Sequence, residues 1–330
     1  GINAGLAAGE AEQAGCRLLA PLGELMRDLP LHRDVAFDQR HRGWSDPSAE
    51  ERLAAAVDQA FARLAVRHVT LRRRDPLAWN NFMNKPLALD WAVREGVGQV
   101  VAWLDSDVLV LREPAALALP GGEDFAAAAP DKNLGSTGPE DGNDPYWREA
   151  CQALGVDLDS LPRVVTDLEG ARIRLYFNSG VFAFRAASGF AAAYLEDCRR
   201  LLAARVASRA AGIFFTDQVA LGLTAHRLGL AWSQLPHAYN RAVGSRSPEG
   251  FAPAALAETV ILHYHDALWP AQMERLLEGL RAARPDVAEW LSGLGPLDNP
   301  QPLLGKAASR LLRWLRGRKL QAHMRGCRVY

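Results

Sequence analysis

Cysteine is scarce in this sequence, and the few cysteines form no pattern. The 330-residue chain has four, which stand far apart at Cys16, Cys151, Cys198 and Cys327. None belongs to a C-x-x-C pair, so the spacing predicts neither a structural zinc site nor a disulfide framework. Because disulfides belong to oxidising compartments, we expect a cytoplasmic protein.

A long apolar run and an excess charge are also missing. No stretch of about 18 apolar residues occurs, so no membrane-spanning helix is predicted, and the start carries no secretory signal. Lys and Arg together number 38, as do Asp and Glu. Neither the charge balance nor any motif favours nucleic acid, so we expect no nucleic-acid partner.

The composition that remains is that of a globular α/β protein. Hydrophobic residues make up 49% and charged residues 23% of the chain, which excludes a disordered polymer. Segments of helical and strand character alternate, which favours an α/β fold. The chain opens on a glycine, and we expect residues 1–5 to be the end of a strand that is cut short. The predicted helices are 8–28, 48–64, 81–96, 147–154, 189–207 and 216–228, and the predicted strands are 66–71, 100–104, 181–184, 230–232 and 260–264.

The first chemical motif is Asp105-Ser106-Asp107, directly after the apolar run 100–104. Five consecutive apolar residues predict a strand that is buried on both faces. Ligands of open α/β sheets bind at the carboxyl ends of strands, where this motif lies. Two carboxylates at i and i+2 are oxygen ligands for Mg²⁺ or Mn²⁺, although a solvated turn would have the same sequence.

The second motif is His263-Tyr264-His265, at the end of the apolar run 260–262. On a continuous strand both histidines would face one side and Tyr264 the other. A neutral imidazole can complete a metal site begun by two aspartates. A hydrogen-bonded core histidine is the alternative for either position.

Three further segments have both functional and ordinary interpretations. Asn178-Ser179-Gly180 could bind sugar hydroxyls or form a turn. Asp217-Gln218 could lie at a reacting sugar, or Asp217 could follow Thr216 as helix N-cap and favour the helix dipole. Lys85 could bind a diphosphate or be a surface lysine.

In chain order these segments resemble the GT-A glycosyltransferases related to glycogenin and to the bacterial lipopolysaccharide galactosyl- and glucosyltransferases, grouped as family 8. The resemblance covers roughly residues 80–270. No single segment is specific, but six occur in the order of the family. They are Lys85 before the metal strand, then WLDSDVLV, FNSGV, TDQVAL, LPHAYN with Asn240, and LHYHD with His263.

The resemblance implies a GT-A fold, with a mixed, mostly parallel sheet flanked by helices. It implies a retaining hexosyltransferase that moves a sugar from a nucleotide-diphospho-sugar, with a UDP-sugar favoured, to a glycan or lipid-linked acceptor of the bacterial cell envelope. Mn²⁺ or Mg²⁺ is then bound by Asp105, Asp107 and His263, and the catalytic residues are Asp217 and Gln218. The expected donor-binding residues are Lys85, Asp105, Ser106, Asn178, Ser179, Gly180, Asn240 and His265. We expect the polar excursion 131–163 to hold the acceptor.

The chain divides into a predicted GT-A domain, 1–290, and a basic tail, 291–330. From residue 306 onward the tail has no acid. Its pattern predicts a basic amphipathic helix that binds an anionic surface of the inner membrane through 306–328, or one that packs its apolar stripe on the domain. The basic residues are Lys306, Arg310, Arg313, Arg316, Arg318, Lys319, Arg325 and Arg328, interleaved with Leu311, Leu312, Trp314, Leu315 and Leu320.

Two other functions stay open from the sequence. A metal-dependent hydrolase would use His263 and His265 with Asp105 and Asp107, and would bind zinc tightly. A sugar-binding protein on the same fold would bind a donor or a glycan without turnover.

Overall fold

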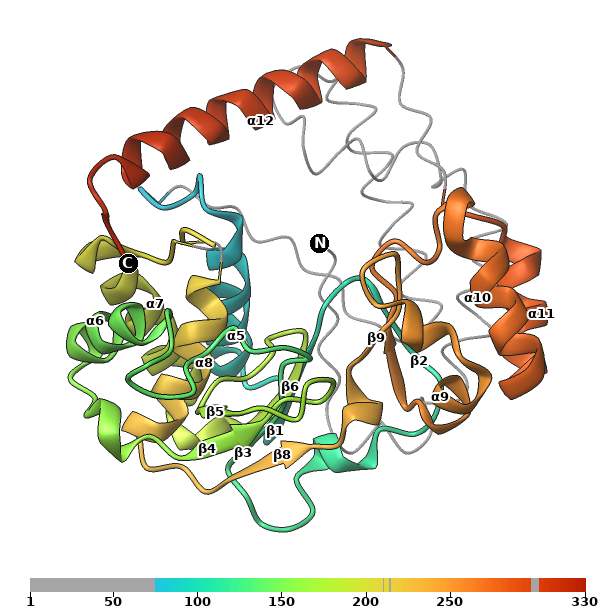
Figure 1. The fold of residues 1–330 in the computed structure, drawn as a ribbon, viewed down its shortest axis with the longest axis horizontal. Coiled ribbons are helices and arrows are strands. Elements are labelled where there is room, and N and C mark those ends of the chain that lie inside the picture. The colour runs from blue at the N-terminus through green and yellow to red at the C-terminus, as the bar shows by residue number, and fades with distance from the viewer. Residues whose placement is uncertain (1–74, 210, 214, 298–302) are drawn as a thin grey trace.

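The structure is a computed structural model that describes residues 75–209, 211–213, 215–297 and 303–330 (Figure 1). The predicted helices 8–28 and 48–64, the predicted strand 66–71 and the expected strand end at 1–5 lie outside these residues. The predicted elements inside them are all found, with ends shifted by a few residues. The 3-10 helices are η1 (Asn81–Met83), η2 (Ala115–Ala118), η3 (Leu158–Ser160), η4 (Ala186–Ser188), η5 (His237–Tyr239) and η6 (Pro248–Phe251).

The largest sheet has the strand order β1 (Val100–Leu104), β6 (Val181–Arg185), β3 (Phe125–Ala128), β8 (Trp232–Leu235). Strand β6 runs antiparallel to both of its neighbours, and β3 pairs in parallel with β8. The expected mixed α/β sheet is confirmed, but the expectation of mostly parallel pairing is wrong for this sheet, because β6 is inserted between β1 and β3. Strands β1, β3 and β8 share one direction, so their carboxyl ends lie at one edge.

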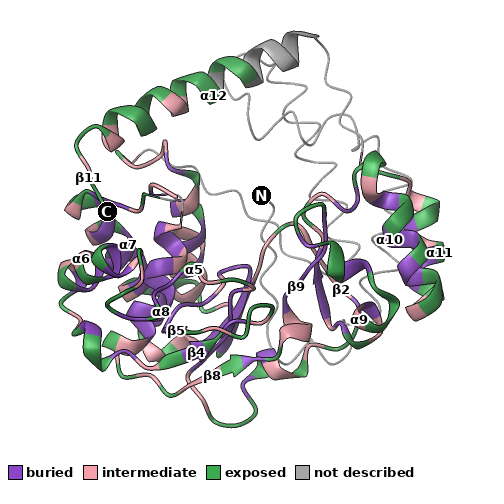
Figure 2. Cartoon of the chain, in the orientation of Figure 1, coloured by how far each residue is buried: buried purple, intermediate pink, exposed green. Residues whose placement is uncertain are grey.

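One face of this sheet is covered by helices. They are α5 (Asn84–Arg94), α6 (Asp144–Leu154), α7 (Phe190–Ala204) and α8 (Thr216–Arg227). Phe182 and Phe184 of β6 point into this helical side, whereas Val181 and Ala183 belong to the core on the opposite face. This alternation follows from the two-residue period of a strand. The result is an aromatic core between sheet and helices. Figure 2 shows the buried residues of these elements in purple.

A smaller sheet stands beside the first and has the order β2 (Val108–Val110), β10 (Ile261–His263), β9 (Arg241–Ala242). It packs with the helices α9 (Pro253–Glu258), α10 (Pro270–Ala283) and α11 (Pro285–Leu294) in a second core. Three residues separate the end of β1 from the start of β2, so Asp105, Ser106 and Asp107 form the junction between the two sheets. The chain therefore places the carboxylate motif where both sheets meet.

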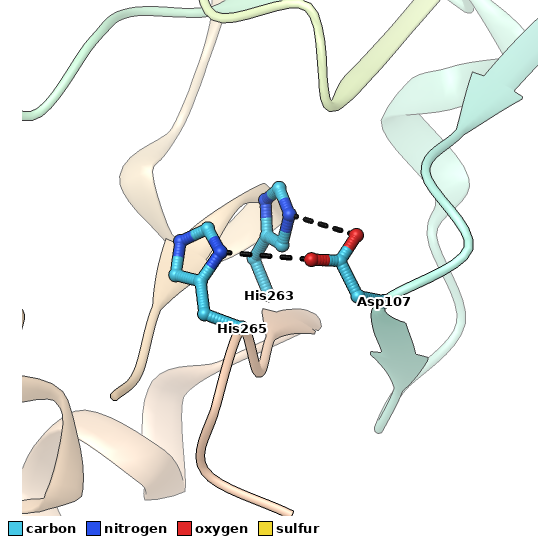
Figure 3. Close-up of side chains that lie close together, drawn as sticks. All are labelled: Asp107, His263 and His265. Carbon is cyan, nitrogen blue, oxygen red and sulfur yellow. Dashed lines mark ion pairs between the residues drawn. The ribbon is translucent and has the colours of Figure 1, made fainter. Parts of the chain in front are cut away.

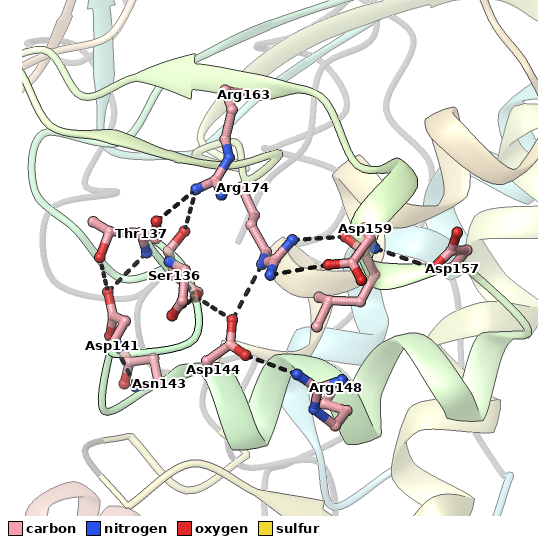
Figure 4. A network of polar contacts seen from close by, with 12 residues as sticks. Ser136, Thr137, Asp141, Asn143, Asp144, Arg148, Asp157, Asp159, Arg163 and Arg174 are labelled. Carbon is pink, nitrogen blue, oxygen red and sulfur yellow. Dashed lines mark hydrogen bonds and ion pairs between the residues drawn. The ribbon is translucent and has the colours of Figure 1, made fainter.

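The excursion after β3 is an ordered part of the fold. It contains α6 and a hairpin of β4 (Arg163–Val165) and β5 (Arg172–Arg174). Buried Arg174 lies 3.1 Å from a carboxylate oxygen of buried Asp144, which also accepts a 2.7 Å hydrogen bond from Ser136 (Figure 4). These paired buried groups tie α6 to the β4–β5 hairpin within the excursion, and removing one partner would leave a buried charge.

The C-terminal tail forms the predicted helix and returns to the main domain. Helix α12 (Leu303–Met324) is followed by β11 (Arg328–Val329), which pairs in parallel with β7 (Val206–Ala207). The domain boundary predicted at residue 290 falls inside α11. Among the described residues, no helix combines the length and the apolar content that crossing a bilayer requires.

Candidate functional site

Lys85 stands at the centre of a buried polar group beneath the carboxyl end of β1. It lies in the first turn of α5 and is only 8% exposed. Its ammonium donates to the carbonyl oxygen of Ser179 at 2.6 Å and to the Ser179 hydroxyl at 2.7 Å. Lys85 is therefore not the surface residue that its isolated position in the sequence allowed.

Two carboxylates share the Lys85 ammonium. The distance from Nζ is 3.2 Å to Asp105 and 3.4 Å to Asp217. Ser179 donates from its hydroxyl to the same Asp217 oxygen at 2.9 Å. Burial raises the pKa of Asp217, and the ammonium of Lys85 opposes that rise. One buried cation thus balances two acids that come from different elements.

Asp105 is held on the Lys85 side of the junction. The indole nitrogen of Trp103 donates to its Oδ1 at 2.7 Å, and its backbone nitrogen donates to the Gly180 carbonyl at 2.8 Å. Both Lys85 and Trp103 contact the same oxygen of Asp105. The structure therefore gives the two predicted metal carboxylates, Asp105 and Asp107, different neighbours.

Asp107 faces two histidines, as Figure 3 shows. Its Oδ1 lies 3.2 Å from Nε2 of His263, and its Oδ2 lies 3.6 Å from Nδ1 of His265. One ligand atom from each of the three residues lies within 4.8 Å of the others. Burial pushes the pKa of Asp107 upward, but the two imidazoles outweigh burial and hold that pKa well below its usual range.

His263 is fixed in place from two sides. Its Nδ1 lies 3.0 Å from the side-chain oxygen of Asn240, next to β9. A ring that donates from Nδ1 to this oxygen presents the lone pair of Nε2 toward Asp107. On its other side the ring abuts Gly180, where a Cβ would lie 2.8 Å from the His263 Cε1 atom. Glycine is thus required at position 180 because the His263 ring comes so close to it. Gly180 therefore lies between the Lys85 group (Lys85, Asp105 and Asp217) and the Asp107 group (Asp107, His263 and His265).

The two histidines meet through a turn and not through strand alternation. Strand β10 ends at His263, and His265 has a left-handed backbone with φ of 41°. The predicted strand 260–264 is therefore shorter at this end, and strand alternation does not place the two histidines on one side, yet the centroids of their rings lie 4.1 Å apart. Tyr264 between them donates from its backbone nitrogen to the Asp107 carbonyl and from its hydroxyl to the Ser106 carbonyl.

The remaining predicted residues surround these two groups. The Asn178 side chain accepts a 2.8 Å hydrogen bond from the Gly180 nitrogen. Gln218 accepts one of 2.9 Å from the hydroxyl of Tyr176. Thr216 is the first residue of α8 and not its N-cap, which is Phe215, and its hydroxyl donates to the Ile213 carbonyl.

Comparison with known proteins identifies the family. A model of the Rhodobacterales glycosyltransferase domain matches residues 6–229, more than half of the chain. The chain belongs to this family. No curated protein and no solved structure shows a significant match.

In this glycosyltransferase the family match includes the Lys85 group and Asp107, and it ends before Asn240 and the two histidines. The structure nevertheless brings His263 and His265 to Asp107, because β10 pairs with β2 and places His263 opposite Val108. The candidate site is therefore completed by a segment beyond the matched range.

Sequence reasoning missed several residues of the candidate site. Trp103 and Tyr176 look like core aromatics in the sequence, but both donate to predicted site residues. A further group also went unnoticed: one ligand atom from each of Asp131, Asp167 and His237 lies within 4.8 Å of the others. Burial raises the pKa of Asp167 to about 6, with His237 lowering it and Asp131 raising it. Asp131 follows β3 and His237 follows β8, so only the strand order reveals that they are neighbours.

Proposed function

We propose that this glycosyltransferase is a metal-dependent, retaining hexosyltransferase of the GT-A type. It takes a nucleotide-diphospho-sugar, with a UDP-sugar favoured, and passes the sugar to a glycan or lipid-linked acceptor. The observation that carries the proposal is the convergence at Gly180, where the Lys85–Asp105–Asp217 group meets the Asp107–His263–His265 group. A diphosphate is negatively charged, so its binding site requires a positively charged side chain beside a set of metal ligands.

The second group has the chemistry of a divalent-cation site. Asp107 offers carboxylate oxygens and His263 offers an imidazole nitrogen whose other ring nitrogen is held by Asn240. Such a second hydrogen bond is typical of histidine ligands. We assign Mn²⁺ or Mg²⁺ to Asp107 and His263, with Asp105 as the proposed third ligand. In the structure Asp105 faces Lys85, whereas His265 has a ligand atom within 4.8 Å of those of Asp107 and His263. When bound, the cation supplies positive charge that neutralises the diphosphate of the donor.

Lys85 adds the protein's own positive charge. Its ammonium is already oriented by Ser179 and balanced by Asp105 and Asp217. A phosphate oxygen that approaches it meets a preorganised donor, which costs little reorganisation. We therefore assign Lys85 to the donor phosphates, with Ser106, Asn178, Ser179, Gly180, Asn240 and His265 lining the donor site.

Asp217 and Gln218 are the proposed catalytic pair. The Asp217 carboxylate is positioned by Ser179 and Lys85, and Gln218 is oriented by Tyr176. A carboxylate placed at the reacting sugar stabilises the positive charge that develops at the anomeric carbon, and a preorganised group does this best. The acceptor oxygen bonds to the anomeric carbon on the face from which the diphosphate departs, and the leaving diphosphate accepts the acceptor's proton. Attack on that face retains the configuration of the anomeric carbon.

The acceptor would bind at the same sheet edge. The Asp131–Asp167–His237 group lies where β3 and β8 end, in the same direction as β1. Carboxylates and an imidazole accept hydrogen bonds from the hydroxyl groups of a glycan. We therefore propose that the excursion after β3 contributes Asp167 to acceptor recognition. The cytoplasmic side of the inner membrane is the proposed place of reaction, in the synthesis of a cell-envelope polysaccharide.

Nucleotide release tests this function. Full-length protein is incubated with UDP-, GDP-, ADP- and CMP-sugars, with Mn²⁺ or with EDTA, for wild type, Asp107→Ala and the control Asp286→Ala. We expect release from one donor class, lost with EDTA and in Asp107→Ala and kept in Asp286→Ala, because Asp286 pairs with Arg284 away from the site.

The same assay separates the other functions. The Asp107–His263–His265 set also suits zinc, so a hydrolase would show zinc-dependent activity without a nucleotide sugar. Metal-dependent binding of a donor without release, even with a glycan acceptor present, would indicate a sugar-binding protein. Absence of both binding and release for every donor would refute the proposed function.

A further inference from the structure

Helix α12 carries a concentration of exposed apolar side chains. Leu311 is 56% exposed, Trp314 54% and Leu315 43%. Large apolar groups scattered singly over a surface are normal, but contiguous ones mark an interaction site. Figure 1 shows α12 along one side of the molecule, and among the described helices and strands none packs along its length.

The exposed residues form one face of the helix. Leu311, Trp314 and Leu315 stand at i, i+3 and i+4, which places them on one side of a 3.6-residue turn. At about 100° per residue, Arg310 and Lys319 flank this face on its two sides, beside Trp314 and Leu315, whereas Arg313 and Arg316 lie on the opposite side of the helix. The guanidinium of Arg318 lies 4.9 Å from the centre of the Trp314 ring, so this cation lies over the apolar face itself.

The charge of this surface has one sign. From residue 303 to residue 330 the chain has no Asp or Glu. An exposed apolar stripe flanked only by cations complements a surface that is anionic in its headgroups and apolar beneath them. A protein partner whose surface carries charges of both signs would not require a helix whose charges are all positive.

The C-terminal end of the helix is tied to the main domain. Strand β11 pairs with β7, Arg205 donates to the His323 carbonyl, and Met324 packs on the main core. Arg328 lies 2.8 Å from Glu149 of α6. These contacts fix one end of α12 to the fold, while the exposed stripe lies in its middle.

We propose that α12 is a membrane-docking surface that binds anionic phospholipid headgroups in the plane of the bilayer. Leu311, Trp314 and Leu315 enter the headgroup region, while Arg310, Arg318 and Lys319 contact lipid phosphates. Because the end of α12 is fixed to the domain, docking holds the whole fold at the membrane. The inference goes beyond the proposed function and does not depend on it.

Co-sedimentation of the full chain with vesicles tests the proposal without any donor. Vesicles of phosphatidylcholine alone are compared with vesicles that also contain phosphatidylglycerol. We expect binding only to the anionic vesicles, weakened by salt. The triple variant R310Q/R318Q/K319Q should bind about a hundredfold more weakly, and Trp314→Ser about tenfold more weakly.

Trp269→Ser is the matched control, since Trp269 is 56% exposed but lies at the start of α10. It should bind vesicles as the wild type does, and the thermal midpoints of both tryptophan variants should stay close to that of the wild type. Equal binding to both kinds of vesicle, or unchanged binding by the α12 variants, would overturn the proposal. So would a large loss of stability in Trp314→Ser alone, which would show that the stripe packs on protein, or binding of RNA in place of vesicles.

Discussion

The Nε2 atom of His263 lies 3.2 Å from the Oδ1 atom of Asp107, and it joins the ends of two strands that pair in the smaller sheet. The Nδ1 atom on the opposite side of the ring is held by Asn240. In this arrangement the Nε2 atom of His263 and the carboxylate of Asp107 are already oriented as ligands for one cation. The geometry at this point leads to the first two predictions.

Asn240→Ala should weaken metal binding without removing a ligand. Loss of the bond to Nδ1 frees the imidazole to rotate and to change tautomer, and outer hydrogen bonds of this kind are worth about 10- to 100-fold in affinity. Isothermal titration with Mn²⁺ measures the change. An affinity equal to that of the wild type would show that Asn240 does not orient the ligand.

Gly180→Ala should disturb the same histidine from the other side. The new Cβ would lie 2.8 Å from Cε1 and 3.0 Å from Nδ1 of His263, so the ring must move. We expect Mn²⁺ affinity to fall at least about tenfold. Gly142→Ala is the control, because a Cβ there meets no atom within 4 Å. If the two substitutions lowered the Mn²⁺ affinity equally, the close approach of the His263 ring would not be the reason for glycine at position 180.

Lys85→Ala should destabilise the fold as well as abolish donor use. It leaves Asp105 and Asp217 beside each other without their shared cation, and breaking a buried pair in this way costs about 3 kcal/mol. Urea denaturation measures the free energy of unfolding. Adding Asp217→Asn to Lys85→Ala should recover part of the loss, because the buried carboxylate is then removed. A single variant as stable as the wild type would show that Lys85 does not balance these acids.

Asp167→Asn should stabilise the protein at neutral and alkaline pH. The pKa of Asp167 is about 6 in the fold against an ordinary value of 3.8. The protonated carboxyl group of Asp167 therefore makes its full contribution to stability below about pH 4, and this contribution is lost as the pH rises through about 6. We expect the variant to melt above the wild type at about pH 8 and close to it at about pH 4.

Asp286→Asn is the control for that experiment. Asp286 accepts hydrogen bonds from Arg284, which lowers its pKa, so its substitution should not raise the melting temperature at about pH 8. Thermal melts across this pH range compare the two variants. The same small shift at every pH for Asp167→Asn would mean that its carboxyl group is not perturbed.

Local patterns determined a large part of this protein. The apolar run 100–104 followed by Asp105 and Asp107 was sufficient to predict a buried strand and a polar site at its end, because both signals lie within a few residues. The order of Lys85, Asn178, Asp217, Asn240 and His263 indicated a glycosyltransferase, and family membership now supports that class. The basic helix of the tail was likewise visible from its spacing.

Only the tertiary structure decided which of these residues meet. Strand β6 lies between β1 and β3, and β10 pairs with β2, so Asp105 turns to Lys85 while Asp107 turns to His263. Trp103 and the group of Asp131, Asp167 and His237 could not be found in advance. A sequence pattern reports neighbours within a helix turn or a strand pair, whereas strand order brings together side chains from segments that carry no signal of each other.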